Sequence, residues 1–315
     1  MVQMNKLCIA FLFFAVHAAA DFTYGVTYEF SGGRFGDNLL SYLHGKWLSY
    51  RYEIPLLYKP FKFSSDLAMH EKELHFHNNM YRNRARTHPA QIESDLQSSQ
   101  PVLIVCPYFP EDPIERKEES EFFFDADWKN EKFREIVLEM IAPKRELRLI
   151  QPPDDTVNVA IHVRLGENYD DDAFRVRFPL KLPPLSFYLE ALPKVLEYFR
   201  GKKIYCHVFT DAERPERIVE TLKTAVPQGI SVKFGWRRGL SLPTFNVLED
   251  FFSLFHFDVL IRSQSHFSMV PSLLHDYAIL CYPSDFIRGE EKFPTITKTE
   301  IRVDAVLYEA LMRER

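Results

Sequence analysis

The stretch that decides the fold is Val157-Asn-Val-Ala-Ile-His-Val-Arg-Leu-Gly-Glu167. Its aliphatic residues alternate with Asn, Ala, His and Arg, and a period of two is typical of a β-strand. His162 and Arg164 then share one face at the carboxyl end of the strand, where open α/β sheets bind ligands. A guanidinium beside an imidazole, followed by an acidic run that ends at Asp172, suits a phosphate-bearing substrate that needs proton transfer. A strand that ends in a surface arginine and a solvated acidic loop would give the same pattern.

Strands and helices alternate through the rest of the second half. We expect strands at 204–209, near 232, at 258–262 and at 278–282, and helices at 186–200, up to 223, at 246–255, 268–276 and 304–312. Regular alternation of this kind is typical of a parallel, doubly wound sheet.

The first half opens in a similar way. A strand is expected at 22–30, followed by the glycine-rich turn Ser31-Gly-Gly-Arg-Phe-Gly36. Asp37 is suited to cap a helix, and a short strand follows at 54–57. Residues 61–100 are polar and irregular, after which a strand at 101–106 and a helix at 130–141 lead to a linker at 151–155. We therefore predict an α/β chain with two facing Rossmann-like domains, divided at residue 150.

Composition limits the class of partner. The chain has 315 residues, 46% of them hydrophobic and 26% charged, with a net charge of −5. A mildly negative chain without a long basic run argues against nucleic acid. Cys106, Cys206 and Cys281 lie in apolar, strand-like runs without metal spacing, which favours buried thiols over disulfides.

The N-terminus has the pattern of a targeting segment. Lys6 precedes an apolar run at 7–16, and Ala18-Ala-Ala20 fits a small-residue cleavage site. Residues 1–20 are predicted to be a signal peptide, with an uncleaved membrane anchor as the alternative. The run is short for a membrane span.

Two further groups carry candidate chemistry. Ser263, Ser265 and Ser268 surround a strand-to-helix turn, so their hydroxyls and the helix amides could bind an anion, although serine also caps helices structurally. Asp211 ends the strand at 204–209 and could bind a ribose hydroxyl or a base edge or cap the next helix. His70, Glu71, His75 and His77 lack the HExxH spacing of a zinc site, which favours a solvated loop.

Three stretches taken together resemble the fucosyltransferase superfamily that includes α1,2-, α1,6- and protein O-fucosyltransferases. Gly33-Arg-Phe-Gly-Asp-Asn-Leu39 is similar to that family's G-[RG]-[FL]-G-N-Q motif. His162-Val-Arg-Leu-Gly-Glu167 is similar to its H-x-R motif. Asp258-Val-Leu-Ile-Arg-Ser-Gln-Ser-His-Phe-Ser268 is similar to a strand followed by S-x-S-[ST]-F-S. The motifs stand in the family's order, with Asp37 where the family has Asn and Asn38 where it has Gln.

The resemblance implies a GT-B fold, GDP-fucose as donor, inversion at the anomeric carbon, and no metal or other cofactor. Residues 21–150 would be the acceptor-side domain and residues 151–315 the nucleotide-sugar domain. Arg164 would stabilise the departing GDP, a role for which a fixed guanidinium is suited. The expected donor-binding residues are Gly33, Arg34, Gly36, Asp37, Asn38, His162, Asp211, Ser263, Ser265, His266 and Phe267.

The catalytic base must come from a carboxylate near the acceptor hydroxyl. Asp172 is the first candidate, because neighbouring aspartates raise one another's pKa, and Glu167 is the second.

We expect a fucosyltransferase-like enzyme acting on a glycan or glycoprotein acceptor. It would lie in the lumen of the ER or Golgi, or be exported or membrane-associated through residues 1–20. Two alternatives remain: a transferase that uses another nucleotide sugar, and a non-catalytic nucleotide- or glycan-binding protein of the same fold.

Overall fold

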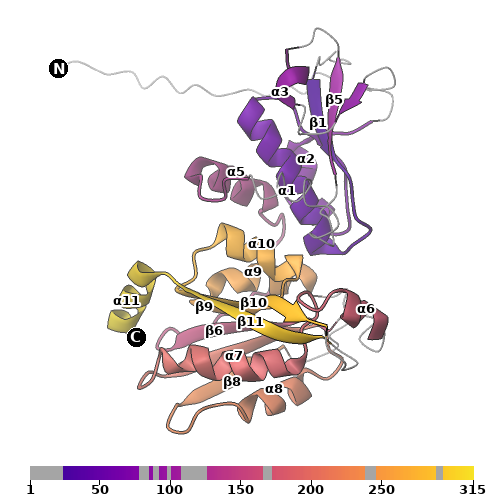
Figure 1. The fold of residues 1–315 in the computed structure, drawn as a ribbon. Coiled ribbons are helices and arrows are strands. Elements are labelled where there is room, and N and C mark those ends of the chain that lie inside the picture. Colours follow the sequence, from indigo (N-terminus) through magenta and orange to yellow (C-terminus); the bar gives the residue numbers. More distant parts are fainter. Residues whose placement is uncertain are drawn as a thin grey trace, which may run out of the picture.

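The computed structural model describes residues 24–77, 85–87, 92–97, 101–107, 126–165, 172–237, 246–288 and 294–315. Figure 1 shows an N-terminal part, which runs from β1 to α5, and a C-terminal part, which runs from β6 to α11.

The C-terminal part is built on a six-stranded sheet in the order β11-β10-β9-β6-β7-β8. Its strands are β6 (Val157–Val163), β7 (Ile204–Thr210), β8 (Val232–Trp236), β9 (Val259–Arg262), β10 (Ile279–Ile287) and β11 (Thr295–Val303). All neighbours pair in parallel except β10 and β11. The parallel strands, numbered along the chain, stand in the order 3-2-1-4-5 of doubly wound nucleotide-binding folds. Such folds bind ligands where the winding reverses, which is here between β6 and β9.

Helices cover both faces of this sheet (Figure 1). The helices α7 (Leu185–Glu197), α8 (Pro215–Lys223) and α11 (Ala305–Glu314) pack on one face. The other face is covered by η4 (Leu254–His256) and the start of α10 (His266–Leu274), which follow α9 (Val247–Ser253). Because apolar side chains leave β6 on both faces, the strand is buried along its whole length, as expected for a central parallel strand.

The N-terminal part has a smaller parallel sheet in the order β1-β5-β4. Its strands are β1 (Tyr24–Tyr28), β4 (Ala85–Thr87) and β5 (Val102–Cys106), and β2 (Leu57–Tyr58) pairs with β3 (Leu74–His75) beside them. The helices are α1 (Phe35–Tyr52), α2 (Met69–Lys72), α3 (Ile92–Asp95) and α5 (Glu131–Ile141), with a turn of 3₁₀ helix, η1 (Ser64–Asp66). The described chain thus has mostly parallel sheets, while a complete second Rossmann-like sheet is not resolved in it.

The two parts share one hydrophobic core. Leu248 and Phe251 of α9 and Val270 and Leu274 of α10 join the cluster around α1. The rings of Phe35 and Phe251 meet edge to face with centroids 5.2 Å apart. In Figure 1, α9 and α10 lie between the large sheet and the N-terminal part, so packed helices fix the geometry between the parts.

The structure confirms the alternation expected in the second half, and it corrects several element bounds. The first helix begins at Phe35, so Asp37 lies in its first turn rather than at its cap. The helix expected from Ser268 begins at His266, and the short strand expected at 54–57 is Leu57–Tyr58. The antiparallel strand β11 was not expected, because most of its side chains are polar and at least partly exposed.

The predicted signal segment, residues 1–20, lies outside the described residues. Within the described chain, no helix combines the length and apolar character that a membrane span requires. Cys106, Cys206 and Cys281 are buried and free, as the sequence predicts.

Candidate functional site

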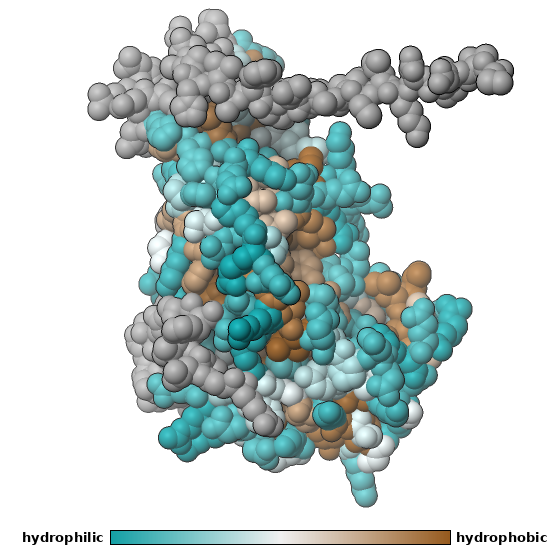
Figure 2. All heavy atoms as spheres, turned by 180° about the vertical axis from the view of Figure 1, so that it is seen from behind, coloured by the Kyte–Doolittle hydropathy of each residue, from teal (hydrophilic) through white to brown (hydrophobic). Residues whose placement is uncertain are grey.

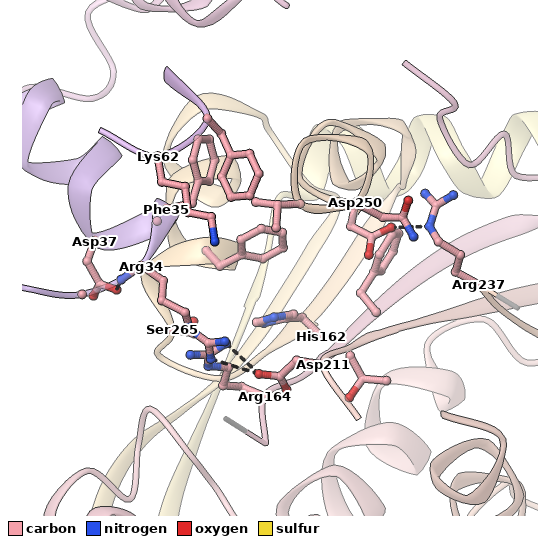
Figure 3. A pocket seen from close by; sticks show the side chains of 18 of the residues that line it. Arg34, Phe35, Asp37, Lys62, His162, Arg164, Asp211, Arg237, Asp250 and Ser265 are labelled. Carbon is pink, nitrogen blue, oxygen red and sulfur yellow. Dashed lines mark hydrogen bonds and ion pairs between the residues drawn. The ribbon is translucent and has the colours of Figure 1, made fainter. Parts of the chain in front are cut away.

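A pocket lies between the two parts, at the carboxyl ends of β6 and β7 (Figure 3). Its described lining is Gly33, Arg34, Phe35, Gly36, Asp37, Asn38, Lys62, Phe63, His162, Arg164, His207, Val208, Phe209, Thr210, Asp211, Pro215, Arg237, Asn246, Val247, Asp250, Ser265 and Phe267. Figure 2, which shows the molecule from behind, has hydrophobic surface at mid-height with hydrophilic surface around it. The lining residues combine aromatic side chains with charged ones, a mixture typical of small-molecule sites.

Two guanidinium groups converge on one carboxylate at the floor of the pocket (Figure 3). Arg164 Nη1 donates to Asp211 Oδ2 at 2.7 Å, and Arg34 Nη2 donates to the same oxygen at 3.1 Å. The other oxygen of Asp211 accepts from the Leu165 amide at 2.8 Å. Asp211 therefore orients both guanidinium groups, while its expected contact with a ribose hydroxyl or a base edge stays a prediction. Arg164 Nε is buried without a hydrogen-bond partner in the described chain.

His162 lies beside the two arginines and is neutral at ordinary pH. Its ring packs against Phe267 with centroids 5.4 Å apart, and its carbonyl accepts from the Tyr188 hydroxyl at 2.9 Å. Burial lowers the pKa of His162 to about 4; Asp211 opposes this effect, while Arg262 and Arg34 add to it. Because Nδ1 is buried without a partner in the described chain, the ring retains hydrogen-bonding capacity for a bound molecule.

The N-termini of α1 and α10 meet at the pocket. A Cβ atom added to Gly36 would clash with the backbone nitrogen of Phe267, so only glycine permits this approach. Ser265, immediately before α10, lines the pocket. Helix N-termini present unpaired amides and a partial positive charge, so two of them beside two arginines favour an anion.

Asp37 lines the pocket, but its carboxylate is fully engaged. Oδ1 accepts from His266 Nδ1 at 2.7 Å and from Lys181 Nζ at 3.0 Å, and Oδ2 accepts from the Arg34 amide at 3.1 Å. Burial alone would raise the pKa of Asp37, but the hydrogen bond and charge of His266, together with Lys181, lower it far below its usual value. Asp37 therefore stays ionised.

The opposite end of the pocket carries a second polar group. Arg237 Nε donates to Asp250 Oδ1 at 2.7 Å (Figure 3). His207 is 3% exposed, its Nδ1 lies 2.8 Å from the Tyr205 hydroxyl, and its Nε2 has no partner in the described chain. Burial lowers the pKa of His207 to about 3, with a further contribution from Arg237, and burial raises the pKa of Asp250 despite Arg237.

The structure brings most of the predicted site residues together. Those that line the pocket are Gly33, Arg34, Gly36, Asp37, Asn38, His162, Arg164, Asp211, Ser265 and Phe267. Ser263 and His266 do not line it: the Ser263 hydroxyl accepts from the Ser265 amide beneath the turn, and His266 turns to Asp37. Arg262 also points away, stacking 4.8 Å from the Tyr282 ring centre.

The two candidate catalytic bases remain predictions. Glu167 lies outside the described residues. Asp172 is the first residue of α6 (Asp172–Arg177), and its side chain is not among those described.

Sequence reasoning missed several pocket residues. Lys62, His207, Arg237 and Asp250 line the pocket but belong to none of the three motifs. The ammonium of Lys62 points into the pocket (Figure 3). Lys181 supports Asp37 from 144 positions away, a separation over which local pattern carries no signal.

Among the described residues, no group of three or more His, Cys, Asp or Glu could hold a metal ion. His70 and His75 contact each other instead, because His75 Nε2 lies 2.7 Å from the His70 carbonyl.

Comparison with known proteins shows the fold. No family model and no curated protein sequence match the chain. Its structure is similar to that of a mutant of the Arabidopsis thaliana fucosyltransferase FUT1 in complex with GDP, with 13% sequence identity and a TM-score of 0.54, covering 86% of this chain and 72% of that one. The Bradyrhizobium fucosyltransferase NodZ also matches, with 13% identity, a TM-score of 0.42, and coverage of 89% and 98%.

The chain therefore has the α/β fold of the GT-B fucosyltransferases, as the three sequence motifs predicted.

Proposed function

We propose that the protein is an inverting, metal-independent glycosyltransferase that uses GDP-fucose to modify a glycan or protein hydroxyl. The observation that carries this proposal is the meeting of Arg34, Arg164 and the N-termini of α1 and α10 at one pocket, in a fold shared with a fucosyltransferase that has been solved with GDP.

The floor of the pocket suits a diphosphate. A guanidinium has five N–H donors in a fixed fork, so the pair with Asp211 occupies only part of the Arg164 guanidinium, whose Nε has no partner in the described chain. Charge develops on the leaving diphosphate as the bond to the sugar breaks, and preorganised donors stabilise that charge most strongly in a water-poor site. Arg164, with 18% of its side chain exposed, is the stronger candidate for this role; Arg34 is 36% exposed.

The far end of the pocket suits a flat base with both donors and acceptors. His207 Nε2 has an unfilled hydrogen bond, and the Asp250–Arg237 pair presents an acceptor beside a donor. An unfilled buried polar atom costs free energy unless a ligand supplies its partner. Binding of guanine at this end would place the diphosphate towards Arg34 and Arg164.

The acceptor hydroxyl would attack C1 of fucose while a carboxylate takes its proton. We assign the base to Asp172, with Glu167 as the alternative. Asp37 is a poor substitute, because its carboxylate is engaged and its pKa is lowered. The N-terminal part, residues 21–150, would complete a second Rossmann-like domain on the acceptor side, facing the nucleotide-sugar domain at 151–315.

A signal or anchor at residues 1–20 would place the enzyme in the secretory-pathway lumen, or export it or attach it to a membrane, where a glycoprotein acceptor is available.

One observation favours a second function, nucleotide binding without catalysis. The three carboxylates that line the described pocket, Asp37, Asp211 and Asp250, are each held in an ion pair. A chain that retained the fold for binding alone would need no free carboxylate.

A nucleotide panel tests the proposal. Thermal unfolding of the full chain in EDTA would be followed with GDP, GDP-fucose, GDP-mannose, UDP and ADP. At 100 times its Kd, a ligand stabilises the folded state by about 2.7 kcal/mol, and we expect this only with the guanine nucleotides. Failure of every nucleotide to stabilise the chain would refute the proposal.

Turnover separates the two functions. GDP release from GDP-fucose in the presence of a glycoprotein mixture indicates transfer, whereas GDP binding without release indicates a binding protein. Arg217→Lys, an exposed substitution on α8, is the matched control.

A further inference from the structure

A carboxylate, an ammonium and an imidazole from three separate segments meet beside the pocket. Asp37 comes from α1 in the N-terminal part, whereas Lys181 and His266 come from the C-terminal part. Both donors reach the same oxygen, Asp37 Oδ1, at 3.0 and 2.7 Å. The exposed fractions of the side chains are 13% for Asp37, 19% for Lys181 and 7% for His266. Ion pairs this well shielded from water are screened far less by salt than surface pairs.

The backbone around this cluster fixes its geometry. The Gln264 amide donates to the Leu180 carbonyl at 2.8 Å, which ties the segment carrying Lys181 to the turn before His266. On the other side, the close approach of Gly36 to Phe267 leaves no space between α1 and α10. The cluster therefore joins three segments that are already held in position.

The same carboxylate determines where Arg34 lies. Asp37 Oδ2 accepts from the Arg34 amide at 3.1 Å, and the guanidinium of Arg34 crosses to Asp211 at 3.1 Å. Moving Asp37 would move the backbone that carries Arg34. The Lys181 ammonium also offsets the negative charge of Asp37, which would otherwise repel an anion in the pocket.

We propose that Asp37, Lys181 and His266 form an ionic clasp that holds α1 against α10 and thereby positions Arg34 for the donor diphosphate. This inference rests on the proposed function, because GDP is the ligand that Arg34 would meet. Asp37 is then a positioning residue that acts through its partners and makes no contact with the donor.

The test measures GDP affinity by calorimetry in the full chain. His266→Phe removes the donor to Asp37, whereas His266→Asn retains an N–H near the position of Nδ1. We expect GDP to bind at least about 10-fold more weakly to the phenylalanine variant and within about 3-fold of wild type to the asparagine variant, because only the phenylalanine variant loses the hydrogen bond to the Asp37 carboxylate. Equal affinity for all three chains would overturn the clasp while leaving the proposed function standing.

A second pair of variants keeps the test decisive if the His266→Phe chain fails to fold. Lys181→Met retains most of the side-chain bulk and removes the charge, and Lys132→Met, at an exposed position on α5, is its control. We expect weaker GDP binding only for Lys181→Met.

The losses of GDP affinity caused by Asp37→Asn and by Lys181→Met should not add up in the double variant. Residues that act as one unit lose most of their effect when either one is replaced. Full additivity would contradict the clasp. Failure of the wild-type chain to bind GDP would overturn the proposed function and this inference together.

Discussion

Replacement of Arg164 by lysine tests the role of the guanidinium at constant charge. Arg164 donates through Nη1 to Asp211 at 2.7 Å, and its buried Nε has no partner in the described chain. A lysine ammonium is a single point, so it can pair with Asp211 or reach a phosphate, but it cannot keep the forked geometry that does both.

The loss follows from that geometry. Removing one transition-state donor costs about 10²–10³-fold in rate, or about 2.7–4 kcal/mol. Because 18% of the Arg164 side chain is exposed, water weakens the interaction and the lower figure applies. We expect a rate of GDP release from GDP-fucose about 10²-fold below wild type, with the thermal midpoint nearly unchanged because the ion pair to Asp211 can persist.

The assay follows GDP release at saturating GDP-fucose with a glycoprotein mixture as acceptor. The control variant Arg217→Lys shows whether replacing an arginine by lysine at an exposed position changes the rate of GDP release. Turnover of the Arg164→Lys chain within about 3-fold of wild type would remove Arg164 from the mechanism.

Three further predictions follow from the same site. Asp172→Asn should abolish transfer and leave GDP affinity within about 2-fold, as calorimetry and GDP release would show; equal turnover would move the base elsewhere, with Glu167 next. Transfer should persist in EDTA, and a loss that Mn²⁺ or Mg²⁺ restores would contradict the assignment of phosphate stabilisation to Arg164. Stability should fall with pH: the unfolded chain protonates His162 near pH 6.5 and the folded chain only near its pKa of about 4. The contribution of His162 to the free energy of unfolding therefore decreases as the pH falls from 6.5 to 4. Urea unfolding midpoints measured across this pH range would show the decrease. His207, with its pKa of about 3, acts in the same direction, and His207→Phe should reduce the loss.

Local pattern predicted the elements of the C-terminal sheet, because a buried parallel strand is a short apolar run with glycine, proline or charge on either side. The strand at 157–163 is the clearest case, since every residue in it is buried. The edge strand β11 was missed because its side chains are mostly polar and at least partly exposed, so it lacks the apolar run of a buried strand. It is placed in the sheet by its pairing with β10.

The bounds of the first helix show how a tertiary contact overrides a local signal. The side chain of Asp37 is suited to cap a helix, but Asp37 is the third residue of this helix, and its carboxylate accepts from the Arg34 amide from within the first turn. The partners that hold Asp37 there, Lys181 and His266, are 144 and 229 positions away.

The residues of the site also fall into those that a local pattern could predict and those that it could not. The motif residues at 33–38, 162–164 and 265–267 could be found because short segments place them at strand ends and helix starts. His207, Arg237 and Asp250 could not, because their meeting depends on the order of strands in the sheet and on α9 packing over it.

We infer that the pocket between the two parts binds GDP through Arg34 and Arg164 without a metal ion. Calorimetric titration of GDP in EDTA into the wild-type chain and the Arg34→Gln/Arg164→Gln double variant tests it most directly. We predict saturable binding at one site per chain for wild type and a loss of at least about 10²-fold for the double variant, since each charged hydrogen bond contributes 1.5–3 kcal/mol. Equal GDP affinity for the two chains, or no binding to wild type, would show that Arg34 and Arg164 do not form a GDP site.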